Sequence, residues 1–184
     1  IIIDNLKSED IVVSTTGKTS RELNEVSDKN ESKNPMFYTI GGMGHANQIS
    51  LGISNNCSKR VFCFDGDGSV IMHMGSMGIV GNNAKNNYYH VLFNNGTHES
   101  VGGQPTIGDV INFELLSKSL GYKNYHKLTS ERDLSYFFKN TIDSVEGPVL
   151  IEVLVGSSSR SDLGRPKETP LEQKNKFIKL FNNK

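Results

Sequence analysis

Short β-rich runs alternate with helical segments along most of this 184-residue chain, and this alternation constrains its fold more than any other feature. The run at 60–64 (RVFCF) shows no alternation of polar and apolar residues, which is typical of a strand buried on both faces. A repeated strand–helix–strand order predicts an α/β fold, a three-layer α/β/α arrangement with a mostly parallel sheet. The other expected strands are 11–14, 88–93 and 149–155, with a weaker one at 122–127.

Helices are expected between these strands. Ser20 is the expected N-cap of the first helix, and Ser130 with Asp133 resembles a capping box at the start of another. A single helix is expected over 69–80, with Val70, Met74, Met77 and Ile79 as its buried residues. The other expected helices are 20–26, the second half of 41–53, 110–120, 130 to about 145, and 171–181.

Composition narrows the class of protein. The 20 Lys and Arg residues balance 20 Asp and Glu residues, so there is no cationic surplus for neutralising nucleic-acid phosphates. No apolar run approaches the roughly 18–20 residues that a membrane-spanning helix requires. The two cysteines, Cys57 and Cys63, indicate neither a disulfide framework nor a metal-ligand pair, which favours a cytoplasmic location.

Polar and glycine-rich motifs follow two of the expected strands. Gly66-Asp67-Gly68-Ser69 ends the run at 60–64, and Asn94-Asn95-Gly96-Thr97 ends the run at 88–93. In parallel α/β sheets, ligands bind beyond the carboxyl ends of the strands, so Asp67 and Asn95 are expected to face one site. With the Thr97 carbonyl, two phosphate oxygens and a water, they would complete the octahedral oxygen set of Mg²⁺. Each motif alone is also an ordinary turn, and the hypothesis depends on the pair.

The pair resembles the metal-and-diphosphate motif of thiamine-diphosphate enzymes. That resemblance implies the thiamine-diphosphate-binding fold over residues 1–184, with thiamine diphosphate and Mg²⁺ as cofactors and Asp67, Asn95 and Thr97 as metal ligands. It also implies that Thr16 and Gly17 lie beside the diphosphate, and that Met43 supports the bent cofactor. The implied cofactor-binding residues are Thr16, Gly17, Gly41, Met43, Gly66, Asp67, Gly68, Ser69 and Asn95.

A narrower resemblance comes from three segments. Residues 14–23, 94–106 and 162–166 look like the phosphonopyruvate decarboxylase family, and sulfopyruvate decarboxylases share much of this pattern. The implied reaction is the non-oxidative decarboxylation of phosphonopyruvate to phosphonoacetaldehyde and CO₂. His98 and Glu99, in the loop after the metal motif, are the candidate proton-transfer residues. The candidate ligands for the anionic substrate are Lys18, Arg160 and Arg165.

One expected part of such an enzyme has no counterpart in the sequence. Thiamine enzymes use a glutamate from a pyrimidine-binding domain, usually across a subunit interface, and no segment here resembles that domain. The missing initial Met and the start at Ile1-Ile2-Ile3 suggest an interior cut. We therefore expect a homo-oligomeric protein, with the pyrimidine-binding domain absent from this chain and supplied by a fused domain or an alpha subunit. The isolated chain is expected to be inactive.

Other functions remain open. The chain could be a sulfopyruvate decarboxylase beta subunit, an acetolactate-synthase-like ligase, or the beta part of a 2-oxoacid oxidoreductase, although the 94–106 loop argues against the last two. A dinucleotide-binding domain is disfavoured because Gly66-Asp67-Gly68 lacks the third glycine of that fingerprint. A non-catalytic module that binds Mg²⁺ and diphosphate is the remaining alternative.

Overall fold

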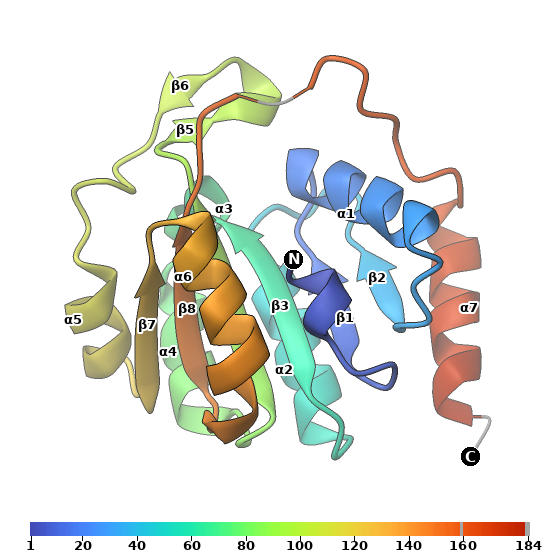
Figure 1. Cartoon of the computed structure of the whole chain (residues 1–184), viewed down its shortest axis with the longest axis horizontal. Helices are drawn as coiled ribbons and strands as arrows, with labels where there is room; N and C mark the ends of the chain where they lie inside the picture. Colours follow the sequence, from blue (N-terminus) through green and yellow to red (C-terminus); the bar gives the residue numbers. More distant parts are fainter. Residues whose placement is uncertain (159, 183–184) are drawn as a thin grey trace.

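The computed structural model describes residues 1–158 and 160–182, and its centre is a six-stranded sheet in the order β2-β1-β3-β4-β8-β7 (Figure 1). Every neighbouring pair in this sheet is parallel, which confirms the predicted α/β class. The strands are β1 (Ile11–Ser14), β2 (Met36–Tyr38), β3 (Val61–Gly66), β4 (Tyr88–Asn94), β7 (Asn124–Leu128) and β8 (Val149–Leu154).

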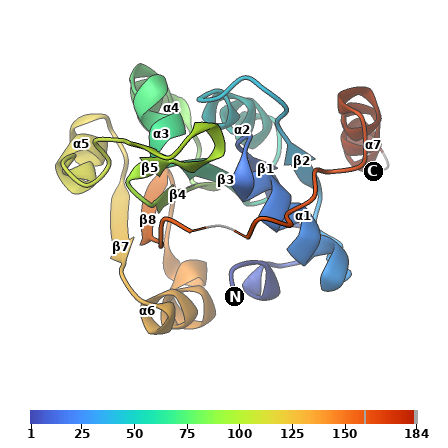
Figure 2. The ribbon, with the colours of Figure 1, turned by 90° about the horizontal axis from the view of Figure 1, so that it is seen from above.

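Helices cover both faces of the sheet, as Figure 2 shows. One face carries α2 (Ala46–Asn55), α3 (Asp67–Met72), α4 (Gly75–Asn83) and α5 (Phe113–Ser119). The other carries the short helix η1 (Ile3–Asn5), α1 (Lys18–Lys29) and α6 (Glu131–Tyr136), which continues into η3 (Phe137–Thr141) and η4 (Ile142–Ser144). At the β2 edge lies α7 (Pro170–Asn182). The predicted three layers are therefore present.

The core is divided between the two faces because side chains alternate along each strand. Phe62 and Phe64 of β3 point to the α1 and α6 face, where the Phe62 ring stacks on Tyr89 with centroids 4.8 Å apart. Cys63 belongs to the opposite core, with α2, α4 and α5. The sequence run at 60–64 lacks polar alternation because both faces of β3 are covered.

Several predicted details were wrong. Gly17, not Ser20, is the N-cap of α1, and Ser20 lies inside the helix with its Oγ donating to the Gly17 carbonyl at 3.0 Å. The single helix expected over 69–80 is two helices, α3 and α4, interrupted at His73 and Met74. Ile79 is 53% exposed rather than buried.

The predicted capping box is present. The Ser130 hydroxyl accepts a hydrogen bond from the Asp133 amide at 3.1 Å, and Thr129 donates to the Asp133 carboxylate. The first of these bonds satisfies an amide that the first turn of α6 cannot pair internally. Hydrogen bonds from Ser130 and Thr129 hold the pKa of Asp133 below its usual value.

The order of the strands positions the functional edge of the sheet. From β1 the chain crosses to α1 on one face, whereas from β3 it crosses to α3 on the other. A crevice therefore opens beyond the carboxyl ends of β1 and β3, which is where doubly wound sheets bind ligands. None of the helices in the described part of the chain is long and apolar enough to cross a bilayer.

Candidate functional site

A cavity of about 580 Å³ lies at the carboxyl ends of β1, β3 and β4. It brings together most of the residues that the sequence singled out, from four separate stretches of chain. The predicted residues on its wall are Thr16, Lys18, Met43, Gly66, Asp67, Gly68, Ser69, Asn95, Thr97, His98 and Glu99. Loops after four neighbouring strands, β2, β1, β3 and β4, thus form one site.

Ser69 connects three of these loops. Its hydroxyl lies 3.0 Å from the Thr15 hydroxyl, after β1, and accepts a hydrogen bond from the Gly44 amide at 2.9 Å. Both Thr15 and Ser69 are buried. The glycine-rich turn that carries Met43 is therefore bonded directly to the first turn of α3.

Asp67 is buried on the cavity wall, with 2% of its surface exposed. The Thr106 hydroxyl donates to its Oδ2, although 39 residues separate the two positions in the chain. Gly108 lies so close that a β-carbon there would come within 2.6 Å of this oxygen and 2.7 Å of Asn94 Oδ1. Any side chain at position 108 would displace Asp67, so this close approach requires glycine.

The two consecutive asparagines have different surroundings. Asn94 is buried, and its amide donates at 2.8 Å to both the Gly108 carbonyl and Glu152 Oε1. Asn95 lines the cavity; its Oδ1 accepts from the Thr97 amide at 3.1 Å, and its Nδ2 donates to Glu99 at 3.3 Å. Asn94 is held by the fold, and Asn95 is the asparagine whose side chain faces the cavity.

A small hairpin closes the site. It consists of β5 (Thr97–His98), the short helix η2 (Glu99–Val101) and β6 (Gln104–Pro105), with β5 and β6 antiparallel. A β-carbon on Gly68 would collide with the His98 ring, so this ring packs directly over the Gly66-Asp67-Gly68 backbone. The loop that the sequence predicted to carry catalytic residues therefore lies against the predicted metal motif.

The comparisons with known proteins assign the family. The family model described as "Thiamine pyrophosphate enzyme, C-terminal TPP binding domain" matches residues 15–153. The chain belongs to this family. The predicted resemblance to thiamine-diphosphate enzymes is thus confirmed, and the matched segment contains all eleven of the predicted residues that line the cavity.

Two named relatives make the similarity within this family more specific. A phosphonopyruvate decarboxylase of Streptomyces viridochromogenes is 37% identical over 176 residues, 96% of this chain and 43% of the relative. A sulfopyruvate decarboxylase beta subunit of Methanocaldococcus jannaschii is 34% identical over 153 residues, 82% of this chain and 78% of the relative. The chain therefore spans less than half of the first relative's length and most of the second's.

Solved structures support the fold. A 2-oxoglutarate:ferredoxin oxidoreductase from Magnetococcus marinus superposes with a TM-score of 0.64 over 95% of this chain and 78% of that chain. Its sequence identity is 13%, so this likeness concerns the fold alone.

The TPP-binding family implies a metal ion beside the diphosphate, and the residues present fit one. Asp67 and Asn95 offer a carboxylate and an amide oxygen to the same cavity, which are the hard ligands that Mg²⁺ prefers. The Thr97 hydroxyl is buried without a hydrogen-bond partner among the described residues. This hydroxyl oxygen is thus free to bond a cation or a water molecule bound to it.

Four predicted residues lie off the cavity wall. Gly17 borders the hairpin, where a β-carbon would come within 3.2 Å of Ser100 Oγ, and its φ of +102° favours glycine. Gly41, with φ of +71°, lies in the exposed turn before Met43. Arg160 pairs with Glu25 at 2.6 Å and Asp162 at 2.9 Å, which raises its pKa. Arg165 is exposed.

Sequence reasoning missed some residues of this site. Glu22 of α1 lies on the cavity wall, and its pKa is raised by burial and by the nearby Glu99 carboxylate. Glu152 of β8 is buried and accepts hydrogen bonds from Asn94 and Tyr125. A buried acid in the otherwise apolar run at 149–155 was the available signal for Glu152, because an isolated charge in such a strand requires partners.

Proposed function

We propose that this chain supplies the diphosphate and Mg²⁺ site of a thiamine-diphosphate-dependent decarboxylase that converts phosphonopyruvate to phosphonoacetaldehyde and CO₂. The convergence of Asp67, Asn95 and Thr97 on one cavity carries the proposal. It is supported by 37% identity to phosphonopyruvate decarboxylases over most of the chain. Bound thiamine diphosphate would supply the electron sink for decarboxylation.

The side chains around the cavity divide into groups. Asp67, Asn95 and the Thr97 carbonyl would hold Mg²⁺, which neutralises the diphosphate. Met43 would support the cofactor ring, and Ser69 keeps the Met43 turn in place through its bond to Gly44. The cofactor contacts that we propose are Thr16, Gly17, Gly41, Met43, Gly66, Asp67, Gly68, Ser69 and Asn95.

His98 and Glu99 are proposed for proton transfer, since both line the cavity. Lys18, on the same wall, is proposed to bind the substrate anion. Arg160 and Arg165 are proposed for the same purpose; for Arg160 this requires exchange of its bonds to Glu25 and Asp162 for bonds to the substrate.

The catalytic unit requires a partner. We propose a pyrimidine-binding domain, either fused to this chain or on an alpha subunit, that supplies the activating glutamate within a homo-oligomeric, cytoplasmic enzyme. The sulfopyruvate decarboxylase beta subunit remains the second candidate, because this chain covers 78% of such a subunit from Methanocaldococcus jannaschii. The isolated chain would lack decarboxylase activity.

Calorimetric titration tests the cofactor part of the proposal. Thiamine diphosphate should bind in the presence of Mg²⁺, binding should weaken strongly when EDTA removes the metal, and NAD should not bind. Metal-dependent binding that survives in Asp67→Ala would contradict the proposed ligand.

Substrate assays test the remainder. The protein combined with its pyrimidine-binding domain should release CO₂ from phosphonopyruvate faster than from sulfopyruvate or pyruvate. A preference for sulfopyruvate would instead favour the second candidate. Robust turnover by the 184-residue chain alone would refute the proposed division of the active site.

A further inference from the structure

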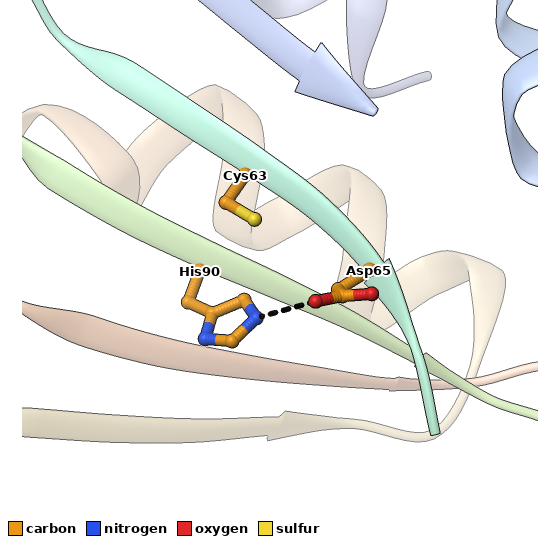
Figure 3. A group of neighbouring side chains, drawn as sticks. All are labelled: Cys63, Asp65 and His90. Atoms are coloured by element: carbon orange, nitrogen blue, oxygen red, sulfur yellow. Dashed lines mark ion pairs between the residues drawn. The ribbon is translucent and has the colours of Figure 1, made fainter. Parts of the chain in front are cut away.

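A second group of polar side chains lies beneath the cavity, in the body of the sheet. Cys63 and Asp65 of β3 and His90 of β4 point toward one another on the face covered by α2, α4 and α5 (Figure 3). Cys63 and His90 are register partners on adjacent strands, and Asp65 is two residues further along the same face. All three are 0% exposed.

Two atoms of this group have no hydrogen-bond partner among the described residues: Asp65 Oδ2 and His90 Nε2. They lie 3.5 Å apart, which is long for a hydrogen bond between them. Buried polar atoms are almost always paired, so two unpaired atoms that face each other call for an explanation. One ion between them would satisfy both, because two N or O ligands of a tetrahedral ion are about 3.4 Å apart.

The third atom completes a ligand set. One ligand atom each of Cys63, Asp65 and His90 lies within 4.8 Å of the other two, so side-chain rotations can bring the three to one centre. The other ring nitrogen of His90, Nδ1, lies 2.9 Å from the Tyr122 hydroxyl. Metal-bound histidines commonly donate their second N–H to such a group, which fixes the orientation of the ring.

Charge also favours a divalent cation. Within the part of the chain that the structure describes, no Lys or Arg forms an ion pair with Asp65, whose carboxylate faces the His90 ring. A 2+ ion bound by a thiolate, a carboxylate and a neutral imidazole gives a group with no net charge, which the interior tolerates.

We propose that Cys63, Asp65 and His90 bind one zinc ion, with a water molecule as its fourth ligand. Mixed S, N and O ligands are typical of Zn²⁺, whereas the all-oxygen set at the cavity is typical of Mg²⁺. Binding displaces the thiol proton of Cys63 to solvent, and no redox change occurs. The ion would link β3 to β4 directly beneath Asp67.

Cobalt substitution tests this proposal. The protein is unfolded, refolded with Co²⁺ in place of Zn²⁺, and its near-ultraviolet absorption measured for a sulfur-to-cobalt charge-transfer band. The cavity site offers no cysteine sulfur, so Co²⁺ bound there gives no such band and cannot imitate the result. Protein refolded with zinc should retain about one Zn²⁺ per chain after desalting.

The variants separate the two cysteines. Cys63→Ser should lose the sulfur-to-cobalt band, whereas Cys57→Ser, at the half-buried second cysteine, should keep it. Tyr122→Phe removes the bond to His90 and should weaken zinc affinity about 10- to 100-fold. Circular dichroism checks that each variant folds.

Two results would overturn the zinc site: wild-type protein with neither bound zinc nor the cobalt band, or a band lost equally in Cys57→Ser. If Cys63→Ser fails to fold, the spectrum of Cys57→Ser still decides, because Cys63 is then the only cysteine in the chain. Thiamine diphosphate plays no part in this test, so its outcome is independent of the proposed decarboxylase function.

Discussion

The amino-terminal parts and the carboxyl ends of strands β3 and β4 differ in what their side chains do. In the amino-terminal parts, Phe62 and Tyr89 stack face to face, and the Arg60 guanidinium lies 5.4 Å from the Phe62 ring centroid. At the carboxyl ends, Asp67 and Asn94 bond to groups far away in the sequence. Burial of apolar surface in the amino-terminal parts stabilises the fold, and polar groups at the carboxyl ends shape the cavity. Substitutions in these two regions should therefore separate stability from binding.

The largest expected effect is in the amino-terminal part of β3. Phe62→Ala removes a fully buried ring and should lower the free energy of unfolding by about 3–5 kcal/mol. Thermal and denaturant unfolding measure this change, and the molecules that remain folded should still bind thiamine diphosphate with the wild-type affinity. Ile79→Ala, at an exposed position of α4, is the control and should change stability by less than about 0.5 kcal/mol. Equal losses in the two variants would contradict the comparison.

Asp67→Asn should have the opposite profile. It removes the proposed negatively charged metal ligand and should weaken Mg²⁺-dependent binding of thiamine diphosphate about 100-fold. The melting temperature without ligand should stay near that of the wild type. Asp109→Asn, an exposed acid in the neighbouring loop, serves as the matched control in the same calorimetric titration. An unchanged affinity in Asp67→Asn would break the link between the strand ends and binding.

The parts of the fold that were predictable from sequence are those with a local signal. Both faces of β3 and β8 are buried, so their sequences are largely apolar, apart from Asp65 and Glu152, and stand out from their surroundings. The motifs at 66–69 and 94–97 were informative because parallel strands place their carboxyl ends together. A simple rule of topology thus brought Asp67 and Asn95 to one site.

The parts that were missed depend on contacts between distant segments. The three residues of β2 pair with β1, and Phe37 packs on Phe177 of α7, whose ring centroid is 5.6 Å away. Thr106 bonds Asp67 only because the hairpin folds back over the site. Neither feature has a periodic pattern of its own, and a helix-forming sequence at 69–80 likewise gave no clear sign of the break at His73.

Glu152→Gln tests whether a buried residue of β8 affects metal binding at the cavity. The buried Glu152 carboxylate accepts bonds from Asn94 and Tyr125, and thereby holds the loop that presents Asn95. The side-chain NH₂ group of a glutamine would face either the Asn94 amide or the Tyr125 hydroxyl, both of which donate hydrogen bonds to this position. The loop should therefore shift. We expect the midpoint of the Mg²⁺ titration at fixed thiamine diphosphate to rise about tenfold, as for other outer-shell partners of metal ligands.

The control for Glu152→Gln is Glu146→Gln, at an exposed acid just before β8. It should leave the Mg²⁺ midpoint unchanged. A loss of stability in Glu152→Gln with normal Mg²⁺ dependence would show that Glu152 stabilises the core and does not support metal binding.

The smallest expected effect is a gain in stability, caused by a substitution on the cavity wall, whereas the changes above are losses. Burial and the nearby Glu99 raise the pKa of Glu22 above its ordinary value of 4.5, so its ionised form is disfavoured in the folded protein. The resulting loss of folding stability is absent when Glu22 is protonated in both the folded and the unfolded protein, and develops as the pH rises above 4.5 and through the folded-state pKa.

Glu22→Gln removes this loss, and solvent screening keeps the gain in stability small. At pH 7 its melting temperature should exceed that of the wild type by up to about 2 °C, with no gain at pH 4. Glu25→Gln, on the same helix, is the control for loss of an acid that pairs with Arg160 and should not become more stable. A Glu22→Gln variant that is less stable than the wild type at pH 7 would show that the cavity wall contributes to folding as the amino-terminal parts of β3 and β4 do.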